Sequence, residues 1–320
     1  MSLYQKCCCL FLGLALLAGR AEATRLRVVA TTSFIADVAQ NIAGSDAEIT
    51  ELIPRSADPH AFDPTPREMA RLQSADLILA NGLGLESFLE KIFSSIGATS
   101  TNRLVIVSQG RAPRAQEHPA DHDHPHEHEH EHEHEHEHAH GETDPHVWLD
   151  PTWVELWADN IADAFAQHDP EHANSFHQRA DDYKRRLREL DEWTRAQFDA
   201  IPRAHRALVT DHDELGYFAA RYDITTVGAL IPNFTTVAET SARSLATLQR
   251  DLHASGARVL VLGASANPAM AEAFARDAGC RIVRLRIHAL GPPNTETASY
   301  LSLMRFNVNT LTEALQEHAP

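Results

Sequence analysis

In the first third of the chain, short apolar runs alternate with longer stretches whose apolar residues recur at helical spacing. Short, mostly apolar runs rich in β-branched residues predict strands at Leu26–Thr31, Ile49–Ile53, Asp76–Ala80 and Leu104–Val107. The stretches between them predict helices at Phe34–Ile42, Arg67–Gln73 and Glu86–Ile96. Because this alternation is typical of a parallel sheet covered by helices, it indicates an α/β lobe.

The second half of the chain repeats the alternation after two predicted helices, Pro151–Gln167 and His172–Ile201. The predicted strands are Ala207–Thr210, Thr225–Ile231, Arg258–Leu262 and Arg281–Leu285. The predicted helices are Glu214–Tyr222, Ser241–Ser255, Pro268–Ala278 and Glu296–Glu317. A helix of some thirty residues extends about 45 Å, enough to run along both halves. We therefore predict an α/β fold with two lobes, each with a mainly parallel sheet flanked by helices, joined by one long backbone helix.

The amino-terminal residues resemble an export signal. Lys6 precedes the apolar run Cys7–Ala18, and Ala21–Ala23 has the small-x-small pattern of a cleavage site. A retained membrane anchor is the alternative, although the apolar run is short for a bilayer. We expect residues 1–23 to be a cleaved signal peptide and the mature protein to be periplasmic. Cys280 would then be its only thiol, which excludes an internal disulfide.

These elements predict the organisation of the whole chain. After the signal peptide at 1–23 we expect an N-terminal α/β lobe at 24–170, a linking helix at 171–201 and a C-terminal α/β lobe at 202–320. Residues 117–142 form a histidine- and glutamate-rich insertion in the first lobe, whose composition is typical of a disordered loop.

This insertion contains eleven histidines between Glu117 and Gly141, six of them in an unbroken Glu-His alternation. Imidazole is a common ligand of zinc, copper and nickel, so the composition indicates metal handling. A solvated acidic loop or an affinity tag would have the same composition. We expect accessory weak metal binding at ten of these residues, namely His122, His124, His126, His128, His130, His132, His134, His136, His138 and His140.

The charge of the chain narrows the range of partners. The formal net charge is −17, and ten acidic residues lie between Glu117 and Glu142. Without this insertion the protein is mildly acidic. Nucleic acid requires a basic surface, so we expect no nucleic-acid binding.

Four histidines outside the insertion lie at the ends of predicted strands, where open α/β sheets bind ligands: His60, His146, His212 and His288. Taken singly, a histidine in such a place is more often a surface or hydrogen-bonded residue than a metal ligand. The first two, however, share the element Asp-Pro-His, whose proline fixes the backbone and whose carboxylate can orient the imidazole. Such widely separated ligands are unlike a zinc finger and suit a cleft between lobes. We expect six other histidines to be solvated, namely His168, His172, His177, His205, His253 and His318.

Several motifs carry a family resemblance that covers almost the whole mature chain. The most specific are DPHAFDPTP at Asp58–Pro66 and DPHVWLDP at Asp144–Pro151. Supporting motifs are HDELGYF at His212–Phe218, SARSLATL at Ser241–Leu248 and SYLSLMRFNVNTL at Ser299–Leu311. With these motifs the sequence resembles the metal-specific substrate-binding proteins of bacterial ABC importers, on the zinc-uptake side.

The resemblance implies that His60, His146 and His212 hold the metal. The family usually has an acidic fourth ligand, whereas this chain has His288 at that position. A fourth imidazole would complete a tetrahedral nitrogen site that suits manganese less well. If His288 points away, water or Asp213 could fill the position.

The function that we expect is a zinc receptor, with Zn²⁺ bound as the transported ligand. Its partner would be an ABC transporter permease, at which the soluble and monomeric protein docks at the membrane, and a periplasmic zinc chaperone is a further candidate partner. One alternative is an exported zinc buffer or chaperone that binds through the histidine-rich insertion. The other is a zinc hydrolase with Asp213 or Glu214 as general base, but the sequence has no His-Glu-x-x-His element or nucleophile elbow, so we expect no enzyme.

Overall fold

The computed structural model describes residues 25–89, 92, 103–114, 143–263 and 268–317. The expected signal peptide and the insertion at 117–142, with the ten histidines from His122 to His140, lie outside these residues, and the expected helix Glu86–Ile96 lies partly outside them. Of the helices in the described part, none is long and apolar enough to cross a membrane.

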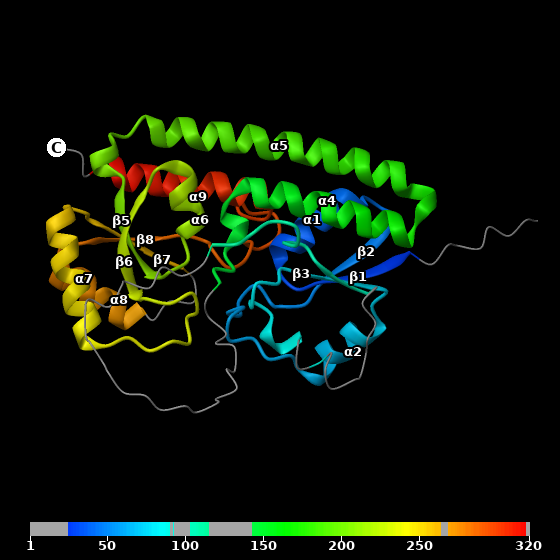
Figure 1. Cartoon of the computed structure of the whole chain (residues 1–320), viewed down its shortest axis with the longest axis horizontal. Helices are drawn as coiled ribbons and strands as arrows, with labels where there is room; N and C mark the ends of the chain where they lie inside the picture. The colour runs from blue at the N-terminus through cyan, green and yellow to red at the C-terminus, as the bar shows by residue number, and fades with distance from the viewer. Residues whose placement is uncertain (1–24, 90–91, 93–102, 115–142, 264–267, 318–320) are drawn as a thin grey trace, which may run out of the picture.

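Two sheets of four parallel strands form the core of the two lobes (Figure 1). The first sheet, in the order β2-β1-β3-β4, consists of β1 (Leu26–Ala30), β2 (Ala47–Glu51), β3 (Leu77–Ala80) and β4 (Leu104–Ile106). The second, in the order β6-β5-β7-β8, consists of β5 (Ala207–His212), β6 (Thr225–Ile231), β7 (Val259–Leu262) and β8 (Arg281–Arg284). The predicted fold class is therefore confirmed. Both sheets have the same strand order. In each, the first strand of the lobe pairs with the second strand on one side and with the third on the other, so the order of the strands reverses there.

Helices cover these sheets, and local sequence signals define where several of them begin. The helices are α1 (Ser33–Ala43), α2 (Pro66–Ser74), α4 (Pro151–His168), α5 (Ala173–Asp199), α6 (Gly216–Tyr222), α7 (Ala242–Ser255), α8 (Pro268–Ala278) and α9 (Tyr300–Gln316). The predicted start of the last helix at Glu296 is wrong. Ser299 caps α9 instead, in a reciprocal hydrogen-bonded box with Ser302.

The long helix α5 runs along both lobes (Figure 1). It packs against α1 and α4 of the first lobe and against α6 and α9 of the second. The largest hydrophobic core is continuous across the lobes and includes Phe34, Trp148, Leu208 and Tyr300. The opposite face of each sheet has a smaller core of its own. Because the lobes share one close-packed core, a hinge motion between them would break apolar contacts.

The segment between β8 and α9 belongs to the second lobe but is hydrogen-bonded to the first. The Trp148 indole N–H donates to the Ile287 carbonyl at 2.7 Å, and the Leu290 N–H donates to Ser33 Oγ at 2.9 Å. The Tyr300 hydroxyl in turn donates to the Trp148 carbonyl at 2.7 Å. These buried bonds fix the position of the segment relative to the first lobe.

We expect Tyr300→Phe to lower the free energy of unfolding by about 1–2 kcal/mol, because it leaves the buried Trp148 carbonyl without its donor. The measurement is urea unfolding of the metal-free protein. Tyr183→Phe is the matched control, since Tyr183 is also buried but its hydroxyl lies 3.5 Å from Asp37. A loss from Tyr300→Phe no larger than the loss from the control would contradict the assignment.

Candidate metal centre

The four histidines lie at the carboxyl ends of strands from both sheets. His60 is in the loop between β2 and α2, and His146 precedes a short 3₁₀ turn before α4. His288 is in the loop after β8. The predicted end of a strand at Thr210 is wrong, because β5 continues and His212 is its last residue. Two of the four candidate ligands thus come from each lobe, as the strand ends of open α/β sheets would place them.

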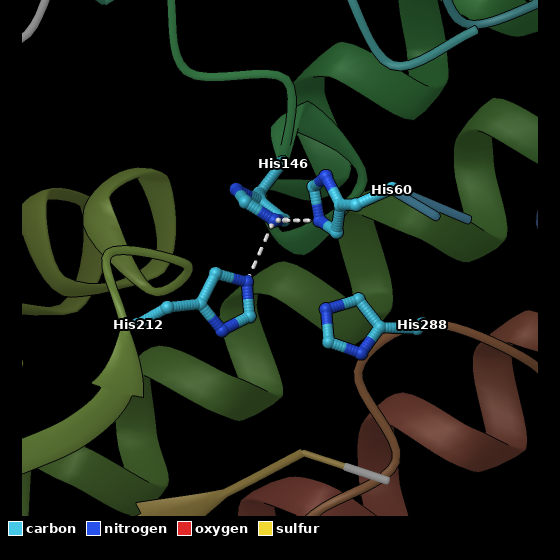
Figure 2. Close-up of side chains that lie close together, drawn as sticks. All are labelled: His60, His146, His212 and His288. Carbon is cyan, nitrogen blue, oxygen red and sulfur yellow. Dashed lines mark hydrogen bonds between the residues drawn. The ribbon is translucent and has the colours of Figure 1, made fainter. Parts of the chain in front are cut away.

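The structure brings these four imidazoles together around a common centre (Figure 2). The Nε2 atom of His146 lies 3.1 Å from Nε2 of His60 and 3.4 Å from Nε2 of His212. One candidate donor atom of each of the four rings lies within 4.8 Å of all the others. Donors bound at about 2.0–2.1 Å to a tetrahedral zinc ion are about 3.3 Å apart, so this spacing suits a single ion.

The fourth position is therefore filled by a side chain that points inward. His288 turns its ring toward the other three (Figure 2). His146, His212 and His288 are buried, and His60 is partly buried. Among the described residues, Asp213 belongs to no cluster of candidate metal ligands, and its backbone N–H donates to the Asn233 carbonyl.

The repeated Asp-Pro-His element forms the same local turn twice. The backbone N–H of His60 donates to Asp58 Oδ1 at 2.9 Å, and that of His146 donates to Asp144 Oδ1 at 3.0 Å. Asp144 also lies 2.8 Å from His146 Nδ1, and this contact directs Nε2 toward the centre. Asp58 instead accepts a hydrogen bond from the Thr236 hydroxyl of the second lobe at 2.6 Å.

Two further carboxylates contact the site, and the sequence did not assign them this role. Asp211 Oδ1 lies 3.2 Å from His212 Nδ1. Glu214 is completely buried beside His212 and His288. The run Asp-His-Asp-Glu at 211–214 signalled that acidic groups are near His212, but alternation along a strand could not tell which of them turn toward the ring.

Burial keeps the imidazoles neutral. It lowers the pKa of His60 to about 2 and that of His288 to about 4, with nearby histidines adding to both shifts. It also lowers the pKa of His146 well below its ordinary value. These rings are therefore uncharged at neutral pH, which is the form that binds metal.

Burial acts in the opposite direction on the carboxyl groups. It raises the pKa of Asp144 to about 7, against the hydrogen bond from the His146 N–H. Burial raises the pKa of Glu214 well above its ordinary value, and the neighbouring Asp211 carboxylate raises it further. The site thus concentrates groups whose charged forms are unfavourable without a cation.

The other histidines in the described part lie away from this cluster. Exposed on the surface, as expected, are His168, His172, His177 and His253. His205 is different, because it is half-buried and its Nδ1 atom is inaccessible. His318 lies outside the described residues.

We expect Asp144→Ala to weaken zinc binding about 10- to 100-fold, because His146 would lose the acceptor that orients its ring. Isothermal titration with a competing chelator measures the change. Asp213→Ala is the control and should leave the affinity unchanged. Equal losses in the two variants would show that general acidity of the region, and not the contact with His146, decides the affinity.

Comparison with known proteins places this geometry in a family. The manganese-binding lipoprotein MntA of Bacillus subtilis (strain 168) is 30% identical over 307 residues, which cover 93% of this chain and 92% of that protein. The iron-binding protein YfeA of Yersinia pestis is 33% identical over 201 residues, or 62% of this chain and 58% of that protein. The solved periplasmic zinc binding protein TroA from Treponema pallidum superimposes with a TM-score of 0.76 at 26% identity, covering 91% of this chain and 99% of that one. Residues 28–314 match the family described as "Zinc-uptake complex component A periplasmic", and the chain therefore belongs to this family.

Proposed function

We propose that the protein is the zinc receptor of an ABC importer, which captures Zn²⁺ in the periplasm and delivers it to a membrane permease. Membership of the family makes it a metal-binding component of such a transporter. The relatives' names include manganese, iron and zinc, so the family alone does not select the ion. The observation that carries the zinc proposal is the cluster of four imidazoles, because nitrogen donors favour zinc over manganese.

The site is built to hold an ion with little rearrangement. Three of its four rings are buried, and Asp144 and Asp211 each contact the Nδ1 atom of a ring whose Nε2 faces the centre. A cavity lined by His60, Pro145 and Thr235 lies next to the least buried ring. The ion enters and leaves on this side, through movement of the loop that carries His60, while the shared core holds the lobes together.

The remaining parts of the proposal concern partners and alternatives. The protein acts as a monomer, exported by its signal peptide, and a periplasmic zinc chaperone is a candidate donor. A hydrolase needs an open coordination position for water, and four inward-facing imidazoles leave no such position in a tetrahedral site. We therefore propose that the chain is not an enzyme. A zinc buffer that acts through the insertion at 117–142 is distinguished by deletion.

Deletion of residues 118–140 should preserve one tight zinc equivalent and remove only weak binding, because the four clustered histidines lie outside the deleted segment. The stoichiometry is measured by titration against a chelating indicator. The matched control is His146→Ala in the full chain, which should lose the tight equivalent and keep the weak ones. Loss of the tight equivalent on deletion would instead support the buffer.

Replacement of His288 tests whether the fourth imidazole binds the ion and selects it. His288→Ala should lower zinc affinity by at least about 10-fold through loss of one donor. His288→Asp should recover part of this loss and improve manganese binding relative to zinc, because an oxygen donor replaces nitrogen. Competitive titration of each variant with both metals is the measurement. Unchanged zinc affinity in both variants would exclude His288 as a ligand.

A further inference from the structure

We propose that Glu214 contributes its carboxylate to the ion held by the histidine cluster, and that this oxygen sets the balance between zinc and manganese. The inference deepens the proposed function and depends on it. It would make the centre a five-coordinate, mixed imidazole–carboxylate site, whereas the four histidines alone make a tetrahedral, all-nitrogen one.

The position of the carboxylate carries the proposal. Glu214 Oε2 lies 3.2 Å from Nε2 of His288, which is the ring nitrogen that points toward the other three histidines (Figure 2). The pair is in direct contact at this separation. Two donors of one tetrahedral zinc ion are about 3.3 Å apart, so the same separation would also suit two ligands of one ion. The same oxygen lies 3.6 Å from Nδ1 of His212. The carboxylate therefore lies on the His212 and His288 side of the cluster. It is outside the group of four donors that lie within 4.8 Å of one another, so it would meet the ion by a side-chain rotation when the ion binds.

The oxygens of Glu214 are buried without a protein donor. The side chain has no exposed surface, and neither oxygen accepts a hydrogen bond from a residue that the structure describes. In the metal-free site the Glu214 side chain is hydrogen-bonded to that of Asp211. Holding it there as a charged carboxylate without a cation would cost several kcal/mol, on the order of the penalty for a buried unpaired ion. A divalent cation beside it would remove that penalty.

Gly263 at the end of β7 makes room for this arrangement. A Cβ atom at this position would lie 3.0 Å from Cε1 of His288 and 3.3 Å from Oε2 of Glu214. Any larger residue would therefore press on both side chains at once. The backbone of the second sheet thus approaches the pair closely enough to hold the carboxylate against His288.

Charge balance points in the same direction. Four neutral imidazoles leave both charges of a buried divalent ion uncompensated, and a buried charge is stable only when it is paired. Asp144 and Asp211 contact His146 and His212 at the Nδ1 atoms, which face away from the centre. Glu214 is the carboxylate beside an inward-facing nitrogen, so it can neutralise part of the charge by direct contact.

A second ion bound by Asp211, His212 and Glu214 is the competing explanation, because candidate donor atoms of these three residues also cluster within 4.8 Å. It would require the His212 ring to bridge two ions through its two nitrogens. The number of ions bound per chain separates this explanation from ours.

The test compares Glu214→Gln with the wild type and with Asp213→Asn, which removes a neighbouring carboxylate that is outside both clusters. Zinc and manganese affinities are measured by competitive titration, and bound Co²⁺ is followed by its visible absorption. Thermal unfolding of the metal-free variants shows whether each is folded. We expect Glu214→Gln to bind zinc about 10- to 100-fold more weakly, to lose more in manganese affinity than in zinc affinity, and to shift the Co²⁺ spectrum. Asp213→Asn should match the wild type.

Three results would overturn the inference. These are unchanged affinities with an unchanged Co²⁺ spectrum in Glu214→Gln, equal losses for zinc and manganese, or two tight zinc ions per wild-type chain. If Glu214→Gln does not fold, Glu214→Asp replaces it. This shorter acid keeps an oxygen donor but cannot keep the same bond, so it should bind both metals more weakly and shift the Co²⁺ spectrum. Unchanged affinities with an unchanged spectrum would equally overturn the inference. Absence of tight zinc binding in the wild type would contradict the proposed function itself, whereas the other results concern Glu214 alone.

Discussion

The site depends on a fixed distance between the carboxyl ends of two separate sheets. That distance is set where the segment between β8 and α9 is hydrogen-bonded to the first lobe, through the Trp148 indole on the Ile287 carbonyl and the Leu290 N–H on Ser33. His288 lies next to Ile287, so the bond that joins the lobes also places the fourth imidazole. Metal coordination tolerates displacements of only a few tenths of an ångström, about ±0.2 Å in bond length. A loose interface could not meet that requirement, and the continuous core along α5 supplies the necessary rigidity.

The same rigidity makes the metal-free site energetically unfavourable. Buried imidazoles with low pKa values crowd against one another, and Asp144 and Glu214 bury oxygens that accept no hydrogen bond from the described residues. Such groups are tolerated when a ligand compensates for them, since binding to the folded state stabilises it by mass action. The fold therefore stores an unfavourable arrangement that a divalent cation relieves. Affinity then arises because the donors are preorganised, and closure of the lobes around the ion is not required.

The sequence predicted the strands and helices of this structure better than the strand ends or the contacts between side chains of different loops. Buried parallel strands such as Leu77–Ala80 are continuous apolar runs, so the periodicity located all eight strands of the described sheets and the long helix. Strand ends were less accurate, because β5 extends to His212 through backbone pairing with β6 that no local pattern reveals. The Asp-Pro-His repeat singled out two of the four clustered histidines through local turn chemistry. The contact of Glu214 with His288 joins residues from different loops, and only the folded backbone brings them together.

In the proposed site, one group of donors positions the ion, and another group selects which ion is bound. His60 and His146 come from the first lobe and, with His212, define where the ion lies, and this part of the site suits any divalent metal that accepts imidazole. The remaining side of the centre belongs to the second lobe, where His288 and Glu214 meet at 3.2 Å. Under the proposed function, a change from nitrogen to oxygen there should alter the preference for zinc or manganese. In this chain that side combines an imidazole with a buried carboxylate. We propose that the choice of ion depends on these two side chains, which the second lobe holds against the first.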